Sequence, residues 1–146
     1  MTPDTQRLRR YRIQSFRLLE SAFEQMRTGR WSRSEDLLWG SLTLAVKAVA
    51  LSRGERLEDQ EAVRAYVAQL AQERRDRRIR DAFGQLSSFA DTVERLRDSR
   101  GRMDRLFPVL DDVASAVERL WEMVPAEEVE IAPANDEEMV PTDDEK

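Results

Sequence analysis

The sequence contains neither cysteine nor histidine among its 146 residues. Without cysteine the chain has no disulfide, no thiolate metal site and no thiol nucleophile. Without histidine it lacks the commonest general base near neutral pH and the commonest metal ligand. It also lacks a glycine-rich phosphate loop, a Gly-x-Ser-x-Gly nucleophile elbow and a zinc-ligand pattern. These absences favour a non-catalytic role, and we expect no metal or cofactor.

Period-two alternation of apolar and polar residues is also absent, so no strand is predicted. Apolar residues recur instead at helical spacing, and Gly29, Gly54 and Gly101 fall at the boundaries between the periodic segments. We therefore predict one domain over 1–124, an all-α, up-and-down bundle of four to five helices. The remainder, 125–146, is predicted to be a disordered acidic C-terminal tail.

The most apolar stretch is 37–51, and a helix over these residues is apolar on nearly every side. Such a helix must be covered from several directions. It is too short, and carries Lys47 too near its middle, to span a bilayer. We predict that it is the second and central helix of the bundle. The arginine-rich N-terminus is followed by an amphipathic segment, not an apolar one, so we expect a cytoplasmic protein without membrane contact.

Amphipathic stripes predict the helices that surround the central one. One runs from about Thr5 to Thr28, one follows a cap at Asp59, one covers 79–96 and one begins near Asp104. Pro108 fits only within the first turn of the last helix. Ser32 and Glu35 match a capping box at the start of the central helix.

Three leucines, Leu37, Leu44 and Leu51, lie seven residues apart on the central helix. They face away from the side that carries Leu38 and Leu42. Because the amphipathic helices supply ample cover for one apolar face, we expect the three leucines to contact a second copy of the chain or a third layer. The alternative is that the chain's own helices cover them.

The net charge of −5 conceals an asymmetry along the chain. Residues 126–146 carry nine carboxylates and one lysine, which leaves 23 basic and 20 acidic residues in the rest. Docking of this tail on a partner, or on the chain's own arginines, is one interpretation of its charge. Arg12 falls inside the apolar stripe of the first helix. It either extends past the bundle towards solvent or is partly buried and directed at a phosphate or carboxylate.

The densest basic cluster spans residues 74–80. It contains Arg74, Arg75, Arg77, Arg78 and Arg80. Arg74, Arg75 and Arg78 share one sector of a helix, and with Arg12 they are the candidates for binding nucleic-acid phosphates. The alternative is a salt-bridged surface, since Glu73 and Arg77, and likewise Asp76 and Arg80, are four residues apart in the favoured acid-first order.

Several short motifs follow one another in a characteristic order. They are Ala22-Phe23, Gly29-Arg30-Trp31, Glu35, Leu38-Trp39-Gly40, the segment 46–50 and Gly54, then Ala82-Phe83-x-x-Leu86-x-x-Phe89 and the seam of Val113, Val117 and Leu120. Over about Gln14 to Val124 this order resembles the HEPN superfamily, and most of all its PaREP-like archaeal branch. The resemblance implies an up-and-down helical bundle that pairs as a homodimer.

Members of the HEPN superfamily act as ribonucleases in toxin–antitoxin and defence systems, or as non-catalytic partners of nucleotidyltransferases. The nuclease members use an arginine followed by a histidine, and this chain has no histidine. No catalytic residue is therefore carried over. We expect a dimeric, non-catalytic binding module that acts with a partner protein of the nucleotidyltransferase or toxin–antitoxin type, or on nucleic acid. The alternatives are a histidine-independent enzyme acting on RNA or nucleotides, and a structural dimer whose tail docks on another protein.

Overall fold

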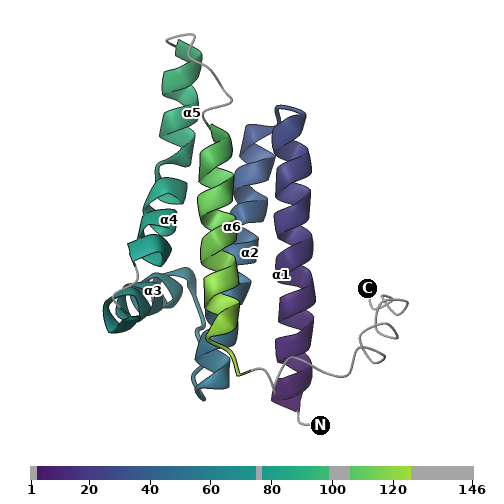
Figure 1. The fold of residues 1–146 in the computed structure, drawn as a ribbon, viewed down its shortest axis with the longest axis vertical. Coiled ribbons are helices and arrows are strands. Elements are labelled where there is room, and N and C mark those ends of the chain that lie inside the picture. The colour runs from purple at the N-terminus through teal and green to yellow at the C-terminus, as the bar shows by residue number, and fades with distance from the viewer. Residues whose placement is uncertain (1–2, 75–76, 99–105, 126–146) are drawn as a thin grey trace, which may run out of the picture.

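The computed structural model describes residues 3–74, 77–98 and 106–125, and all the regular secondary structure in these ranges is helical. The six helices within them are α1 (Pro3–Arg27), α2 (Trp31–Ser52), α3 (Gln60–Arg74), α4 (Arg77–Ser87), α5 (Phe89–Asp98) and α6 (Phe107–Glu122). The prediction of an all-α bundle is confirmed. Helices α1, α2 and α6 lie side by side, α4 packs against α6, α5 follows α4 and contacts α2, and α3 runs across the long axis (Figure 1). The predicted tail, 126–146, lies outside the described residues.

Helix α2 is the central helix, as its apolar character predicts. It packs most extensively against α1 and also contacts α3, α4, α5 and α6. Seven of its apolar residues have no exposed surface: Leu38, Leu42, Ala45, Val46, Ala48, Val49 and Ala50. Because these residues point in several directions around the helix, only a helix covered on several sides can bury them all.

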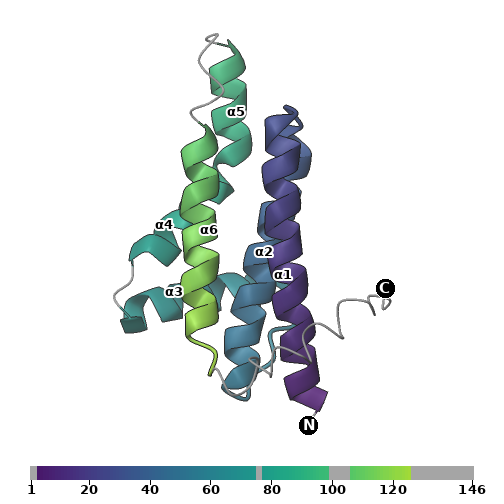
Figure 2. The same cartoon turned by 45° about the vertical axis from the view of Figure 1, so that its right-hand side comes forward.

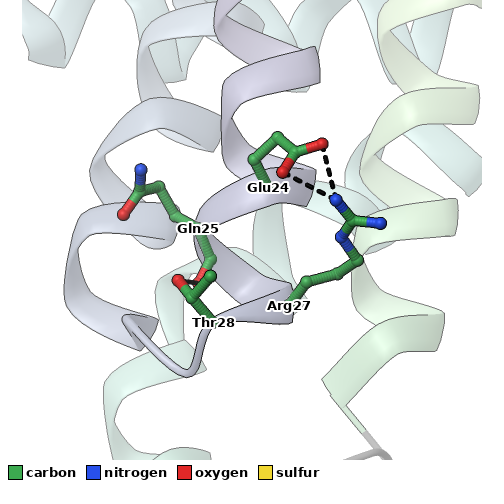
Figure 3. Close-up of polar contacts among 4 residues, drawn as sticks. All are labelled: Glu24, Gln25, Arg27 and Thr28. Carbon is green, nitrogen blue, oxygen red and sulfur yellow. Dashed lines mark hydrogen bonds and ion pairs between the residues drawn. The ribbon is translucent and has the colours of Figure 1, made fainter.

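Helices α1 and α2 are each followed by a glycine in the left-handed conformation. Gly29 has φ 79° and Gly54 has φ 83°, which confirms both as C-terminal caps. The last turn of α1 is further held by the Thr28 hydroxyl, which donates to the Gln25 carbonyl over 3.0 Å. Arg27 pairs with both oxygens of Glu24 at 2.7 and 2.8 Å (Figure 3). Arg27 is thus a cation at the helix C-terminus, where the helix dipole favours one.

The start of α2 differs from the predicted capping box. The helix begins at Trp31, with Arg30 as N-cap and no side-chain cap, so Ser32 lies inside the first turn and the prediction is wrong. Trp31 packs against the core, which favours helix one residue earlier than the cap. The serine hydroxyl that joins the start of α2 to α1 is that of Ser34, which is buried and donates to the Ala22 carbonyl over 3.0 Å.

The helix predicted over 79–96 is divided into α4 and α5 at Ser88. The Ser88 hydroxyl donates to the Gly84 and Gln85 carbonyls at 3.2 and 3.3 Å, and so satisfies the end of α4. Phe89, directly after the break, is 1% exposed. Two other predictions are confirmed: the Asp59 carboxylate accepts from the Ala62 backbone amide over 2.8 Å, and Pro108 lies in the first turn of α6. Helix α6 begins at Phe107, and the start predicted near Asp104 lies outside the described residues.

A buried polar contact joins the three long helices at their centre. Ser15 of α1 donates to the Ser41 carbonyl of α2 over 2.9 Å, and Ser41 donates back to the Ser15 carbonyl over 2.7 Å. The Trp121 indole N–H of α6 donates to the Ser15 hydroxyl over 3.3 Å. Since both serines are fully buried, this contact fixes the axial register of α1 against α2 and α6.

Candidate functional site

The first candidate is an apolar surface that we name the α1–α2 face, made of Leu18, Leu37, Gly40 and Leu44. On α2, Leu37, Gly40 and Leu44 follow one another at three- and four-residue spacing and therefore form one stripe. Leu18 of α1 lies over Gly40, since a Cβ built there would be 3.0 Å from Leu18 Cδ1. All three leucines are half-buried. The glycine lets the two helices approach closely at this point.

Three leucines were predicted to contact a partner. Leu37 and Leu44 belong to this face, whereas Leu51 does not. Leu51 is 8% exposed and belongs to the buried core of the single chain. Its edge borders a pocket of about 220 Å³ where α1 begins and α2 ends. The pocket is lined by Arg7, Lys47 and Arg56 together with two glutamates, so it has no single preferred sign of charge.

The second candidate is the first turn of α4, where Arg77, Arg78 and Arg80 are exposed. That turn has no acidic residue. Glu73, the residue expected to neutralise Arg77 in a salt-bridged surface, instead accepts a hydrogen bond from Arg53 over 3.1 Å, and this bond raises the pKa of Arg53. Positive side chains at a helix N-terminus are repelled by the helix dipole. The first turn of α4 is therefore suited to bind an anion, such as a phosphate group.

The structure does not join the candidates for phosphate binding into one site. Arg75 and the side chain of Arg74 lie outside the described residues. Arg12 is on α1, which α2 and α6 separate from α4 (Figures 1 and 2). Arg12 is exposed, with its guanidinium carbon 5.5 Å from the centre of the Phe16 ring, which agrees with the interpretation that it extends towards solvent. The arginine that is buried on α1 is Arg9, at 9% exposed.

The third candidate is a group of side chains around Trp39, at the junction of α2, α3 and α4. The Trp39 ring packs edge-on against Phe83 at 5.5 Å, and the Arg64 guanidinium lies 5.7 Å from its centre. Burial raises the pKa of Glu35, although its hydrogen bond with Trp39 acts in the opposite direction. Because the cluster is held together by packing around the indole ring, we interpret it as a structural contact between the helices.

No group of three acidic residues that could hold a metal ion occurs among the described residues. In the same part of the chain, no helix combines the length and apolar character needed to cross a membrane. Comparisons of this chain with protein-family models, with curated proteins and with solved structures find no match. The candidate sites therefore stand on their geometry alone.

Proposed function

We propose that this chain is a non-catalytic, HEPN-like helical binding module that works as a homodimer and binds a partner protein of the nucleotidyltransferase or toxin–antitoxin type. The observation that carries the proposal is the α1–α2 face, where Leu18, Leu37 and Leu44 are half-buried around a close approach of two helices. Pairing of this face with itself about a two-fold axis buries the same leucines of both copies. Apolar surface removed from water in this way favours association.

The homodimer is tested by Leu44→Asp, because a carboxylate at the centre of a self-paired face meets its own copy. We expect light scattering to give the dimer mass for the wild type and the monomer mass for the variant, with unchanged helicity by circular dichroism. Phe107→Asp is the matched control, since Phe107 is 39% exposed on α6 outside the face. A dimer that survives Leu44→Asp, or a monomeric wild type, contradicts the proposal.

Binding of nucleic-acid phosphates is a second candidate function, favoured by the first turn of α4. The pairing of Glu73 with Arg53 supports it, because the nearest predicted neutralising partner of Arg77 is committed elsewhere. Phosphate oxygens would meet both the arginine side chains and the positive end of the helix dipole. This binding is independent of base sequence, and its strength falls steeply as salt rises.

The phosphate site is tested by gel shift of a short single-stranded RNA across a salt series. Arg77→Gln/Arg80→Gln removes two candidate contacts, and each contact to a single strand contributes about 0.7 to the slope of log affinity against log salt. We expect the slope to fall by about 1.4 for this variant. Arg30→Gln/Arg33→Gln removes the same charge from exposed positions at the start of α2 and is the matched control. Equal slopes for the two variants contradict the assignment to α4.

A further inference from the structure

The N-terminal half of α1 concentrates positive charge. Residues 5–17 contain no aspartate or glutamate and include five arginines: Arg7, Arg9, Arg10, Arg12 and Arg17. Cations are unfavourable near a helix N-terminus because the positive end of the helix dipole lies there. Asp4, in the first turn, pairs with Arg56 of the loop after α2 over 3.3 Å. At the opposite end of α1, Arg27 has Glu24 as its ion-pair partner (Figure 3).

The arginines of this segment differ in exposure. Arg9 is only 9% exposed, and its neighbour Leu8 is 1% exposed. Arg10, Arg12 and Arg17 are exposed on the same half of the helix. We name these five arginines the α1 basic surface, and its chemistry fits an acidic segment with some apolar side chains.

The described chain ends beside this surface. Trp121, in the last turn of α6, donates to Ser15 of α1, and its ring centre lies 6.4 Å from that of Phe16. Val124, three residues later, is buried, and Pro125 follows. Figures 1 and 2 both show the C-terminal end of α6 at the same end of the bundle as the N-terminus of α1. The last described residue, Pro125, is therefore close in sequence to side chains that contact α1.

The segment 126–146 has the complementary chemistry and sufficient length. It carries nine carboxylates and one lysine, and Val129 and Ile131 alternate with acidic residues near its start. Ten residues of extended chain span about 33 Å, whereas Arg7 and Arg17 are separated by only about 15 Å along the helix. Attachment to the same chain also gives the segment a local concentration of the order of millimolar at the surface.

We propose that the acidic segment 126–146 docks on the α1 basic surface of its own chain. Its carboxylates pair with the exposed α1 arginines through charge-assisted hydrogen bonds. While docked, the segment covers these arginines against other polyanions. The interaction is electrostatic, so it weakens as salt shortens the range of the attraction.

Paramagnetic broadening tests the proposal in the full chain. Since the protein has no cysteine, Ala134→Cys provides a single site for a spin label within the segment. We expect the backbone amide signals of residues 5–17 to lose most of their intensity at low salt. The signals should regain it near 1 M salt, where the screening length is about 3 Å. Unaltered intensities at 5–17, or uniform loss along all helices, overturn the proposal.

Two comparisons assign the contact to its partners. Arg10→Gln/Arg12→Gln/Arg17→Gln, at exposed positions that do not enter the core, should abolish the broadening, whereas Arg77→Gln/Arg80→Gln on α4 should leave it unchanged. Persistence of the broadening in the first variant overturns the proposal. Mixing spin-labelled chains with separate isotope-labelled chains identifies the occupant. Broadening in that mixture shows that the segment docks on a second copy, and so overturns docking within one chain.

Discussion

Replacing Ser15 with alanine tests the polar contact between the three long helices. The Ser15 hydroxyl donates to the Ser41 carbonyl over 2.9 Å and accepts from the Trp121 indole N–H over 3.3 Å. The substitution removes the acceptor of an indole N–H on a side chain that is 6% exposed. The Ser41 hydroxyl keeps its 2.7 Å hydrogen bond, because alanine retains the backbone carbonyl that accepts it.

The expected magnitudes differ between the two serines. Ser15→Ala loses two hydrogen bonds and leaves the buried Trp121 N–H without an acceptor, so the free energy of unfolding should fall by about 2–3 kcal/mol. Ser41→Ala leaves no buried donor without an acceptor, since Ser15 still donates to the Ser41 carbonyl, and should cost about 1 kcal/mol. We predict that Ser15→Ala lowers the free energy of unfolding more than Ser41→Ala does. The packing effect of a lost hydroxyl is common to both variants, so it does not change this order.

Urea denaturation followed by far-UV circular dichroism, at one fixed protein concentration, measures both free energies. Trp121→Phe removes the indole N–H together with its need for an acceptor. Combined with Ser15→Ala it should therefore cost less than the sum of the single substitutions, by about 1 kcal/mol. If Ser15→Ala is no more destabilising than Ser41→Ala, the Trp121 hydrogen bond contributes nothing and the reasoning is refuted.

Three further predictions concern single positions. Gly84→Ala should raise the free energy of unfolding by about 0.5–1 kcal/mol, because Gly84 is exposed within α4 and a Cβ there meets nothing within 4 Å. Gly29→Ala should lower it, since φ is +79° there; thermal melts that shift in the same direction for both contradict this. Burial raises the pKa of Glu35 above 4.5, so the folded state binds its proton more tightly, and stability falls as pH rises through this range. Glu35→Gln should therefore be at least as stable as the wild type at neutral pH, with a gain that disappears in acid. A gain that grows in acid contradicts the burial argument.

The parts of the fold that depend on local chemistry could be predicted from the sequence. The apolar run of α2, the caps at Gly29, Gly54 and Asp59, and the position of Pro108 each depend on residues within one turn. The division between α4 and α5 was missed because Ser88 reads as an ordinary helical residue in the period of the apolar stripe. The chain ends α4 there because the Ser88 hydroxyl satisfies its last carbonyls.

The candidate sites depend on contacts between distant segments, and the sequence predicted them less well. Leu37, Leu44 and Leu51 are equivalent in a seven-residue pattern, but a straight helix drifts by about 20° per seven residues. By Leu51 the stripe has turned into the core. The pairing of Arg53 with Glu73 crosses from α2 to α3, so local spacing favoured Arg77 instead. The buried contact of Ser15 was missed, although a serine inside an apolar stripe needs a buried partner and could have indicated it.

Native-state hydrogen exchange of α2 tests the central claim most directly, that this helix is enclosed by the others. The backbone amides around Leu42, Val46 and Val49 should be the slowest to exchange in the chain, and should open only with global unfolding. Amides on the exposed side of α1 and in α5 should exchange earlier through local opening. Exchange of the α2 amides at or before those of α1 would contradict the account.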